Sequence, residues 1–262
     1  MKTENQRMPV LFVGHGSPMN AIEETPFAAA WREEARLLPR PRAILCVSAH
    51  WETEGTRVTS MPHPRTIHDF YGFPDELYGV SYPAPGSPEL AEDVRRLIGS
   101  TAVHTDDAGS WGLDHGAWSV LRRMFPAADI PVVQLSLDRA RPPRFHYDLA
   151  AELMPLRDQG VLIVGSGNLV HNLGMLQWDA TTPYPWAAEF DRLAEELILT
   201  GAHDRLVAYP ELGQAARLAV PTNEHYLPLL YALALRTGED EARFFAEGIV
   251  YGSISMSSLR IG

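Results

Sequence analysis

The chain has 262 residues, of which 45% are hydrophobic and 21% are charged, proportions typical of a folded globular protein rather than a disordered chain. Its 33 acidic residues exceed its 22 lysines and arginines, which leaves a net charge of −11. This excess of negative charge argues against nonspecific binding to nucleic acid and against attraction to an anionic membrane surface.

Short apolar runs alternate with amphipathic segments along the chain. Runs rich in Val, Ile and Leu predict buried strands over Pro9–Val13, Ala43–Ser48, Pro131–Leu135 and Val161–Gly165. Apolar residues at three- and four-residue spacing predict helices over Pro26–Leu38, Pro88–Ile98, His115–Phe125, Phe145–Arg157, Trp186–Thr200 and Asn223–Arg236. The tail from Phe244 to Ile261 alternates in the manner of edge strands. We therefore expect a single α/β domain over residues 1–262, with a central mostly parallel or mixed sheet and helices on both faces.

Histidines lie at or just beyond the ends of three of the expected strands. His15 stands between two glycines after the first strand, His50 ends the second, and His171 follows the fourth. In open α/β sheets the ligand crevice lies beyond the carboxyl ends of the strands. The sequence therefore predicts that these three side chains meet in one crevice.

Neutral imidazoles from separate elements are what a transition-metal site requires. A site with three protein ligands and open coordination positions fits the pattern, because catalytic metals keep room for substrate, oxygen or water. Glu224 and His225 are both candidates for the third ligand, and they diverge by about 100° on a helix. A non-haem iron site favours Glu224, whereas zinc accepts three histidines. The residues alone leave this choice open.

The other histidines receive different interpretations. His171 is a candidate acid or base, since an ordinary pKa near 6.5 suits proton transfer at neutral pH. His115 follows Asp114, a possible cap of the next helix, and either faces the pocket or is a buried structural residue. His68 is a candidate for the pocket mouth. Ordinary surface or structural roles are expected for His63, His104, His146 and His203.

Seven motifs occur in order along nearly the whole chain. They are GHGSP (14–18), SAHW (48–51), TIHDFYGFP (66–74), YPAPGSP (82–88), WGLDHGAW (111–118), SGNLVHN (166–172) and NEHYLPLLYA (223–232). In this order they resemble the DODA-type extradiol aromatic ring-opening dioxygenases of the class III, LigB-like superfamily.

The resemblance implies a single-domain α/β enzyme that opens a catechol ring with O₂ at a non-haem metal. Members of this family cleave the 4,5 bond of L-DOPA, and the seco-DOPA product cyclises to betalamic acid. The family's metal-binding histidines fall on His15, His50 and His225, which resolves the earlier choice against Glu224. His171 matches a histidine that is counted among the ligands in some members and acts as the base in LigB-like relatives.

Further expectations concern cofactor, substrate and mechanism. Fe(II) is the expected active metal, and Zn(II) could occupy the same site. His171 or His115 would deliver protons to the opened ring. Ser17, His68 and Tyr226 are candidates for contacts with the amino-acid part of the substrate. Two alternatives remain: a zinc hydrolase that uses the same histidines, which would consume no oxygen, and a binding protein that retains the fold without the chemistry.

The expected cellular compartment follows from three features that the sequence lacks: a pair of cysteines, a signal peptide and a membrane span. The single cysteine, Cys46, cannot form an internal disulfide, which favours a reducing compartment. The N-terminus is too polar for a signal peptide, and no apolar run approaches the roughly 18 residues of a membrane span. We therefore expect a cytoplasmic protein with a small catechol and O₂ as its partners, and with no nucleic-acid or membrane partner.

Overall fold

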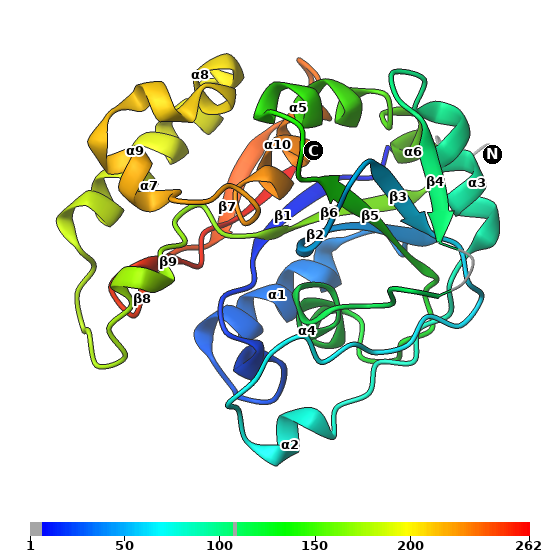
Figure 1. Ribbon diagram of the computed structural model, residues 1–262, viewed down its shortest axis with the longest axis horizontal. Helices are drawn as coiled ribbons and strands as arrows, with labels where there is room; N and C mark the ends of the chain where they lie inside the picture. Colours follow the sequence, from blue (N-terminus) through cyan, green and yellow to red (C-terminus); the bar gives the residue numbers. More distant parts are fainter. Residues whose placement is uncertain (1–6, 107–108) are drawn as a thin grey trace.

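A mixed sheet crosses the centre of the computed structural model, which describes residues 7–106 and 109–262 (Figure 1). Eight strands form it among these residues, in the order β4-β3-β5-β2-β6-β1-β10-β7, and β8 and β9 form a separate pair. The strands are β1 (Val10–Gly14), β2 (Ala43–Thr53), β3 (Thr56–Thr59), β4 (Val103–Asp106), β5 (Val132–Asp138), β6 (Val161–Gly167), β7 (Ala242–Ala246), β8 (Ile249–Val250), β9 (Ile254–Ser255) and β10 (Ser258–Ile261).

The four central strands β5, β2, β6 and β1 are parallel. The outer strands break the pattern: β3 is antiparallel to β5, β10 is antiparallel to β1, and β7 is antiparallel to β10. Because the parallel strands end at one edge, the segments that follow them meet there. The expected α/β class with a mixed sheet is confirmed.

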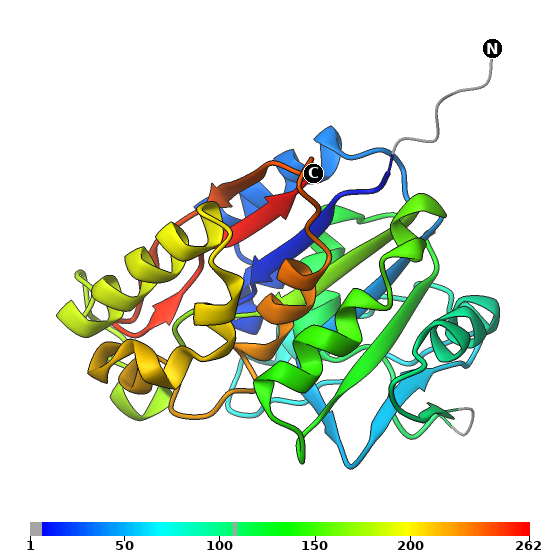
Figure 2. The same ribbon diagram turned by 90° about the horizontal axis from the view of Figure 1, so that it is seen from above.

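Helices cover both faces of the sheet (Figures 1 and 2). On one face lie α1 (Pro26–Leu37) and α4 (His115–Met124), and on the other lie α5 (Pro143–Ala151) and α10 (Leu227–Ala234). The remaining α-helices are α2 (Asp75–Tyr78), α3 (Pro88–Leu97), α6 (Pro155–Asp158), α7 (Pro185–Leu199), α8 (His203–Val207) and α9 (Gln214–Ala219). No helix in the described parts of the chain is both long enough and apolar enough to cross a membrane.

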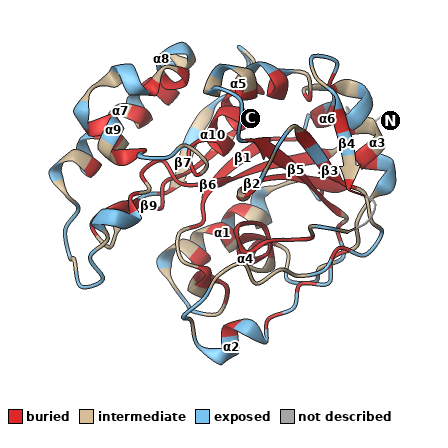
Figure 3. Ribbon diagram, in the orientation of Figure 1, coloured by how far each residue is buried: buried red, intermediate tan, exposed pale blue. Residues whose placement is uncertain are grey.

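Each central strand is buried on both faces, as the red sheet in Figure 3 shows. Alternate side chains enter two separate clusters. Val10 and Phe12 of β1 pack with α5 and α10, whereas Leu11 and Val13 pack with Trp31 of α1 and with α4. This two-sided burial explains why the strands read as continuous apolar runs rather than as alternating ones.

The helix starts follow local capping chemistry. The Thr25 hydroxyl accepts the Ala28 N–H ahead of Pro26 in α1, and the Asp114 carboxylate accepts the Ala117 N–H at the start of α4. These contacts satisfy backbone donors that the first helical turn leaves free. The proposed cap at Asp114 is thus present.

Several boundaries differ from those expected. The segment Phe145–Arg157 forms two helices, α5 and α6, because Pro155 has no N–H with which to continue the first helix. The last helix begins at Leu227 rather than Asn223, with Pro228 in its first turn, where proline is favoured.

The sheet also has members that the sequence did not reveal. The strands β3 and β4 are only four residues long, too short for a clear pattern. In the tail, β10 lies inside the large sheet between β1 and β7, and β7 forms one edge of that sheet.

Candidate metal centre

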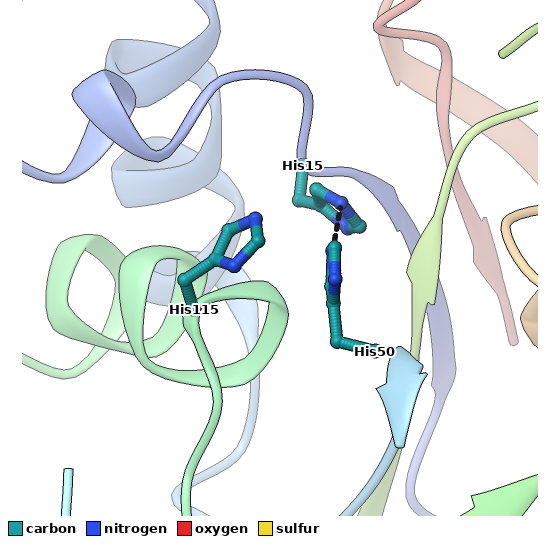
Figure 4. A group of neighbouring side chains, drawn as sticks. All are labelled: His15, His50 and His115. Carbon is teal, nitrogen blue, oxygen red and sulfur yellow. Dashed lines mark hydrogen bonds between the residues drawn. The ribbon is translucent and has the colours of Figure 1, made fainter. Parts of the chain in front are cut away.

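Five histidines from five separate segments line one pocket. His15 follows β1, His50 lies on β2, His115 opens α4, His171 follows β6 and His225 precedes α10. Figure 4 shows the rings of His15, His50 and His115 pointing toward one another. The expected meeting of the strand-end histidines is observed, and His115 faces the same pocket.

An irregularity in β2 turns His50 into the pocket. The pairing of β2 with β5 shifts register between Val47 and Glu52, so the strand continues to Thr53 rather than ending at Ser48 as expected. Within this irregular stretch the Ser48 hydroxyl accepts the His50 N–H. A β-bulge re-aims a side chain in this way, and bulges are frequent beside functional sites.

Close backbone approach brings His225 to the end of β6. A Cβ built on Gly167 would lie 2.1 Å from the His225 carbonyl oxygen, a distance that no side chain can occupy. The Asn168 N–H also donates to that carbonyl, at 2.8 Å. Glycine in this strand therefore permits the turn that carries His225 to pack directly on the sheet.

The hydrogen bonds of Ser166 fix the tautomer of His15. The Ser166 hydroxyl donates its one hydrogen to the Gly116 carbonyl at 2.6 Å, so it can only accept from His15 Nδ1, which lies 3.0 Å away. His15 therefore carries its proton on Nδ1. Its Nε2 keeps a free lone pair that faces the pocket.

Carboxylates stand behind two further rings. His225 Nδ1 lies 3.1 Å from Glu224 Oε1, and His50 Nδ1 lies 3.4 Å from Asp69 Oδ2. An ionised carboxylate only accepts hydrogen bonds, so both contacts favour a proton on Nδ1 and a lone pair on Nε2. Glu224 is thus engaged with His225 rather than standing as an independent group.

The approach of His15 to His50 fits a cation. Their Nε2 atoms lie 3.1 Å apart (dashed line in Figure 4), and the contacts of both Nδ1 atoms leave a lone pair on each. Two lone pairs that face each other in a buried site repel unless a positive charge lies between them. The donor set therefore suits a divalent transition metal.

Burial keeps these rings neutral. The pKa values of His15 and His225 are held well below the ordinary value, first by burial and then by the neighbouring histidines. Burial also lowers the pKa of His171 to about 4, although the charge of Glu224 opposes this effect. A neutral imidazole offers the lone pair that a metal requires or that a base uses.

Among the residues that the structure describes, two groups of side chains each have ligand atoms within 4.8 Å of one another. The first is His15, His50 and His115, and the second is His171, Glu224 and His225. The groups are adjacent, since the ring centroids of His15 and His50 lie 5.3 Å and 5.0 Å from that of His225. Together they form one cluster rather than two sites.

Asp69 is a member of this cluster that the sequence reasoning missed. Its Oδ2 lies 3.0 Å from His115 Nδ1, and its Oδ1 accepts a hydrogen bond from the backbone N–H of His115. Burial alone would raise the pKa of this carboxyl, but the contacts with His115 and the charge of His50 outweigh it, and the pKa is lowered. Its position in TIHDFYGFP, directly after His68, was the available signal.

The three candidate substrate contacts have different surroundings. Ser17 lines the pocket, whereas the fully buried Tyr226 donates its hydroxyl hydrogen to the Leu206 carbonyl. His68 Nε2 lies 2.9 Å from the Val80 carbonyl, and its ring packs on Trp118. Tyr226 and His68 thus contact other parts of the fold and lie outside the pocket lining, and their role as substrate contacts stays a prediction.

Comparisons with known proteins agree with the geometry. The family model of the catalytic LigB subunit of aromatic ring-opening dioxygenase matches residues 9–262. The chain is 48% identical to the 4,5-DOPA dioxygenase extradiol of Escherichia coli (strain K12), over 98% of this chain and 95% of that protein. It is 38% identical to the enzyme of the same name from Beta vulgaris, over 98% of this chain and 100% of that one.

A solved structure shares the fold. The crystal structure of an uncharacterised protein from Escherichia coli K12 superposes with a TM-score of 0.85 at 43% identity, over 98% of this chain and 100% of that chain. The resemblance carried by the seven ordered motifs is confirmed. This chain belongs to the LigB family of aromatic ring-opening dioxygenases and is an extradiol ring-cleaving dioxygenase.

Proposed function

We propose that the protein opens the ring of L-DOPA between C4 and C5 with O₂, giving a seco-DOPA that cyclises to betalamic acid. The relatives at 48% and 38% identity are both named 4,5-DOPA dioxygenase extradiol, which supports this substrate and bond. The observation that carries the proposal is the cluster of neutral histidines at the ends of the parallel strands, because it suits a metal that binds both hydroxyls of a catechol.

The proposed metal ligands are His15, His50 and His225. Their ring centroids form a nearly regular triangle, with separations of 5.0, 5.3 and 5.0 Å. Three imidazoles that each bind one ion at about 2.1 Å have centroids roughly 5 Å apart. His115 fits less well, since its centroid lies 3.9 Å from that of His50 but 5.7 Å from that of His15.

Fe(II) is the proposed metal, and Zn(II) can bind the same donors without supporting oxygen chemistry. When bound, iron would make O₂ reactive toward the catechol and would stabilise the negative charge that forms. The protein contributes the three lone pairs, while Ser166, Asp69 and Glu224 hold the rings in the required tautomer.

His171 is the proposed base. Its ring stacks on that of His225, with centroids 3.5 Å apart and planes 9° apart. His225 would hold the metal through its Nε2 lone pair, and the parallel His171 ring, which faces that of His225, would stand beside the bound substrate. This arrangement supports His171 as the group that takes a catechol proton rather than as a fourth ligand.

His115 is the proposed acid. In this role a ring protonated at both nitrogens keeps its Nδ1 hydrogen toward Asp69, 3.0 Å away, and passes its Nε2 proton to the opened ring. Ser17 accepts the Met19 N–H through its hydroxyl oxygen, so its own hydrogen stays available to a substrate oxygen. These residues give the pocket one group that accepts protons and one that delivers them.

The test is reconstitution of metal-free protein with Fe(II) or Zn(II) without oxygen, followed by L-DOPA and air. We expect oxygen uptake matched to a yellow product with Fe(II) only. A zinc hydrolase would consume no oxygen, and the family match disfavours that alternative. Absence of uptake with both metals across several catechols would refute the ring-opening activity.

We further propose that the protein works in the cytoplasm. Cys46 is a free thiol buried in the sheet, and burial raises its pKa well above the usual value. A protonated buried thiol is protected from oxidation, and the fold requires no disulfide. Export of the native protein with a cleaved leader would contradict this proposal.

A further inference from the structure

The walls of the pocket above the histidines are apolar. One wall is formed by Phe70 and Phe73, and the Phe70 ring reaches down to His115, with centroids 5.6 Å apart. A second group of lining residues is Leu173, Leu176, Trp178, Tyr251 and Ile254. A substituent on a ring held at the histidines therefore lies against hydrophobic side chains.

The mouth of the pocket is also hydrophobic. Leu173 and Trp178 line the pocket while 64% and 67% of their surfaces remain exposed. The Trp178 ring packs edge-on against Tyr251, at 4.9 Å between centroids. Large apolar side chains exposed around a cavity mark a binding surface for an apolar group.

Charges that could pair with a zwitterionic substituent are missing from this lining. Among the described residues that line the pocket, none is Asp, Glu, Lys or Arg. The carboxylates of Asp69 and Glu224, next to the lining histidines, are already engaged, Asp69 with His50 and His115, and Glu224 with His225 and Thr222. An ammonium or carboxylate group brought against these walls would lose its hydration without a compensating ion pair.

We propose that this site selects catechols whose ring substituent is uncharged and apolar over catechols that carry an ammonium or carboxylate group. The inference rests on the proposed ring-opening activity and concerns which catechol the same site prefers. L-DOPA remains a substrate, with its amino-acid end held toward solvent at the mouth. It loses the apolar contacts that a neutral chain of equal length makes with Leu173 and Trp178.

The first experiment compares four catechols that share the ring and carry chains of similar length. They are 4-propylcatechol, which is neutral; dopamine, a cation; 3-(3,4-dihydroxyphenyl)propionate, an anion; and L-DOPA, a zwitterion. With Fe(II)-loaded protein, we expect kcat/KM for 4-propylcatechol to exceed that for each charged analogue by about tenfold or more. Equal or higher kcat/KM for L-DOPA would overturn the inference.

A pair of variants tests whether the walls set this preference. In Trp178→Lys a cation replaces an apolar wall residue, so kcat/KM should fall for 4-propylcatechol and rise for the anionic analogue. Tyr71→Lys is the matched control, because Tyr71 is 92% exposed and does not belong to the pocket lining. The same change of preference in both variants would attribute the effect to overall charge and refute the role of the wall.

Binding separates failure of this inference from failure of the proposed activity. Calorimetry of the same four catechols with Zn(II)-loaded protein without oxygen measures affinity alone. Tightest binding of 4-propylcatechol supports the inference even if oxygen uptake fails, in which case only the ring-opening proposal is lost. Tighter binding of L-DOPA refutes the inference whatever the oxygen uptake.

Discussion

Ser166, Asp69 and Glu224 each face the Nδ1 atom of a histidine in the pocket. These contacts decide which ring nitrogen carries the proton and hence which lone pair points inward. The chemistry of the site therefore depends on residues behind the histidines as much as on the histidines themselves. Single substitutions can separate the two contributions.

Removal of a ligand and removal of the base should have different effects. We expect His15→Ala, His50→Ala and His225→Ala each to abolish metal binding and activity. His171→Ala should retain metal and lose about 10²- to 10⁴-fold in kcat, the range that proton transfer contributes. Metal content by mass spectrometry and oxygen uptake provide the two measurements. Unchanged turnover in His171→Ala would exclude this residue as the base.

Asp69→Asn should weaken the metal site without deleting a ligand. The amide keeps the shape of the carboxylate but removes the charge that holds the protons on His50 and His115. We expect about 10- to 100-fold lower metal affinity, measured by competition with a chelator. Asp75→Asn, at an exposed position in α2, is the control and should leave the affinity unchanged. Wild-type affinity in Asp69→Asn would show that the carboxylate does not orient the rings.

At the scale of elements, close packing of β6 against the turn before α10 sets the position of His225. Gly167→Ala would force its Cβ to within 2.1 Å of the His225 carbonyl oxygen. We expect a loss of about 1–3 kcal/mol in the free energy of unfolding, as for other overpacked sites, together with weaker metal binding. Urea denaturation and metal titration measure the two effects.

Gly238→Ala is the matched control for this substitution. Nothing lies within 4 Å of a Cβ built at Gly238, so this variant should keep both stability and metal affinity. If Gly167→Ala behaves in the same way, the turn is not held by close backbone contact.

At the scale of the whole molecule, Arg157 ties distant parts of the chain together. Its buried guanidinium donates to the carbonyls of Met8 and Leu235 and forms a two-bond ion pair with Asp240. Burial would raise the pKa of Asp240, but Arg157 and Thr237 outweigh it and lower the pKa to about 2. These contacts of Arg157 therefore join the residues just before β1, α6 and the segment after α10.

This ion pair predicts how stability depends on pH. Because folding lowers the pKa of Asp240, its ionised carboxylate contributes fully to the free energy of unfolding above the unfolded pKa of about 4. This contribution is lost as the pH falls toward 2. Asp240→Asn leaves Arg157 buried without its partner and should cost about 3–5 kcal/mol at neutral pH. Thermal unfolding should be measured from pH 2 to 7. The difference in midpoint temperature between wild type and variant should become smaller below pH 4. A constant difference would contradict this account.

Several features followed from the sequence because their causes are local. Buried parallel strands are continuous apolar runs, so β1, β2, β5 and β6 were recognisable, and the carboxyl-end rule brought His15, His50 and His171 together. The ordered motifs identified the family. Short strands such as β3 and β4 were not predicted, because four residues are too few to show a clear hydrophobic pattern.

The tertiary structure decided what depends on contacts between distant residues. Only packing shows that Tyr226 is buried with its hydroxyl bound to Leu206, that His68 is held by Val80, and that Asp69 reaches two histidines. Position along a strand or helix determines which face a side chain occupies. The order of the strands and the close contacts at glycines determine which side chains meet. The contacts between these side chains then determine the tautomers of the histidines and form the apolar walls of the pocket.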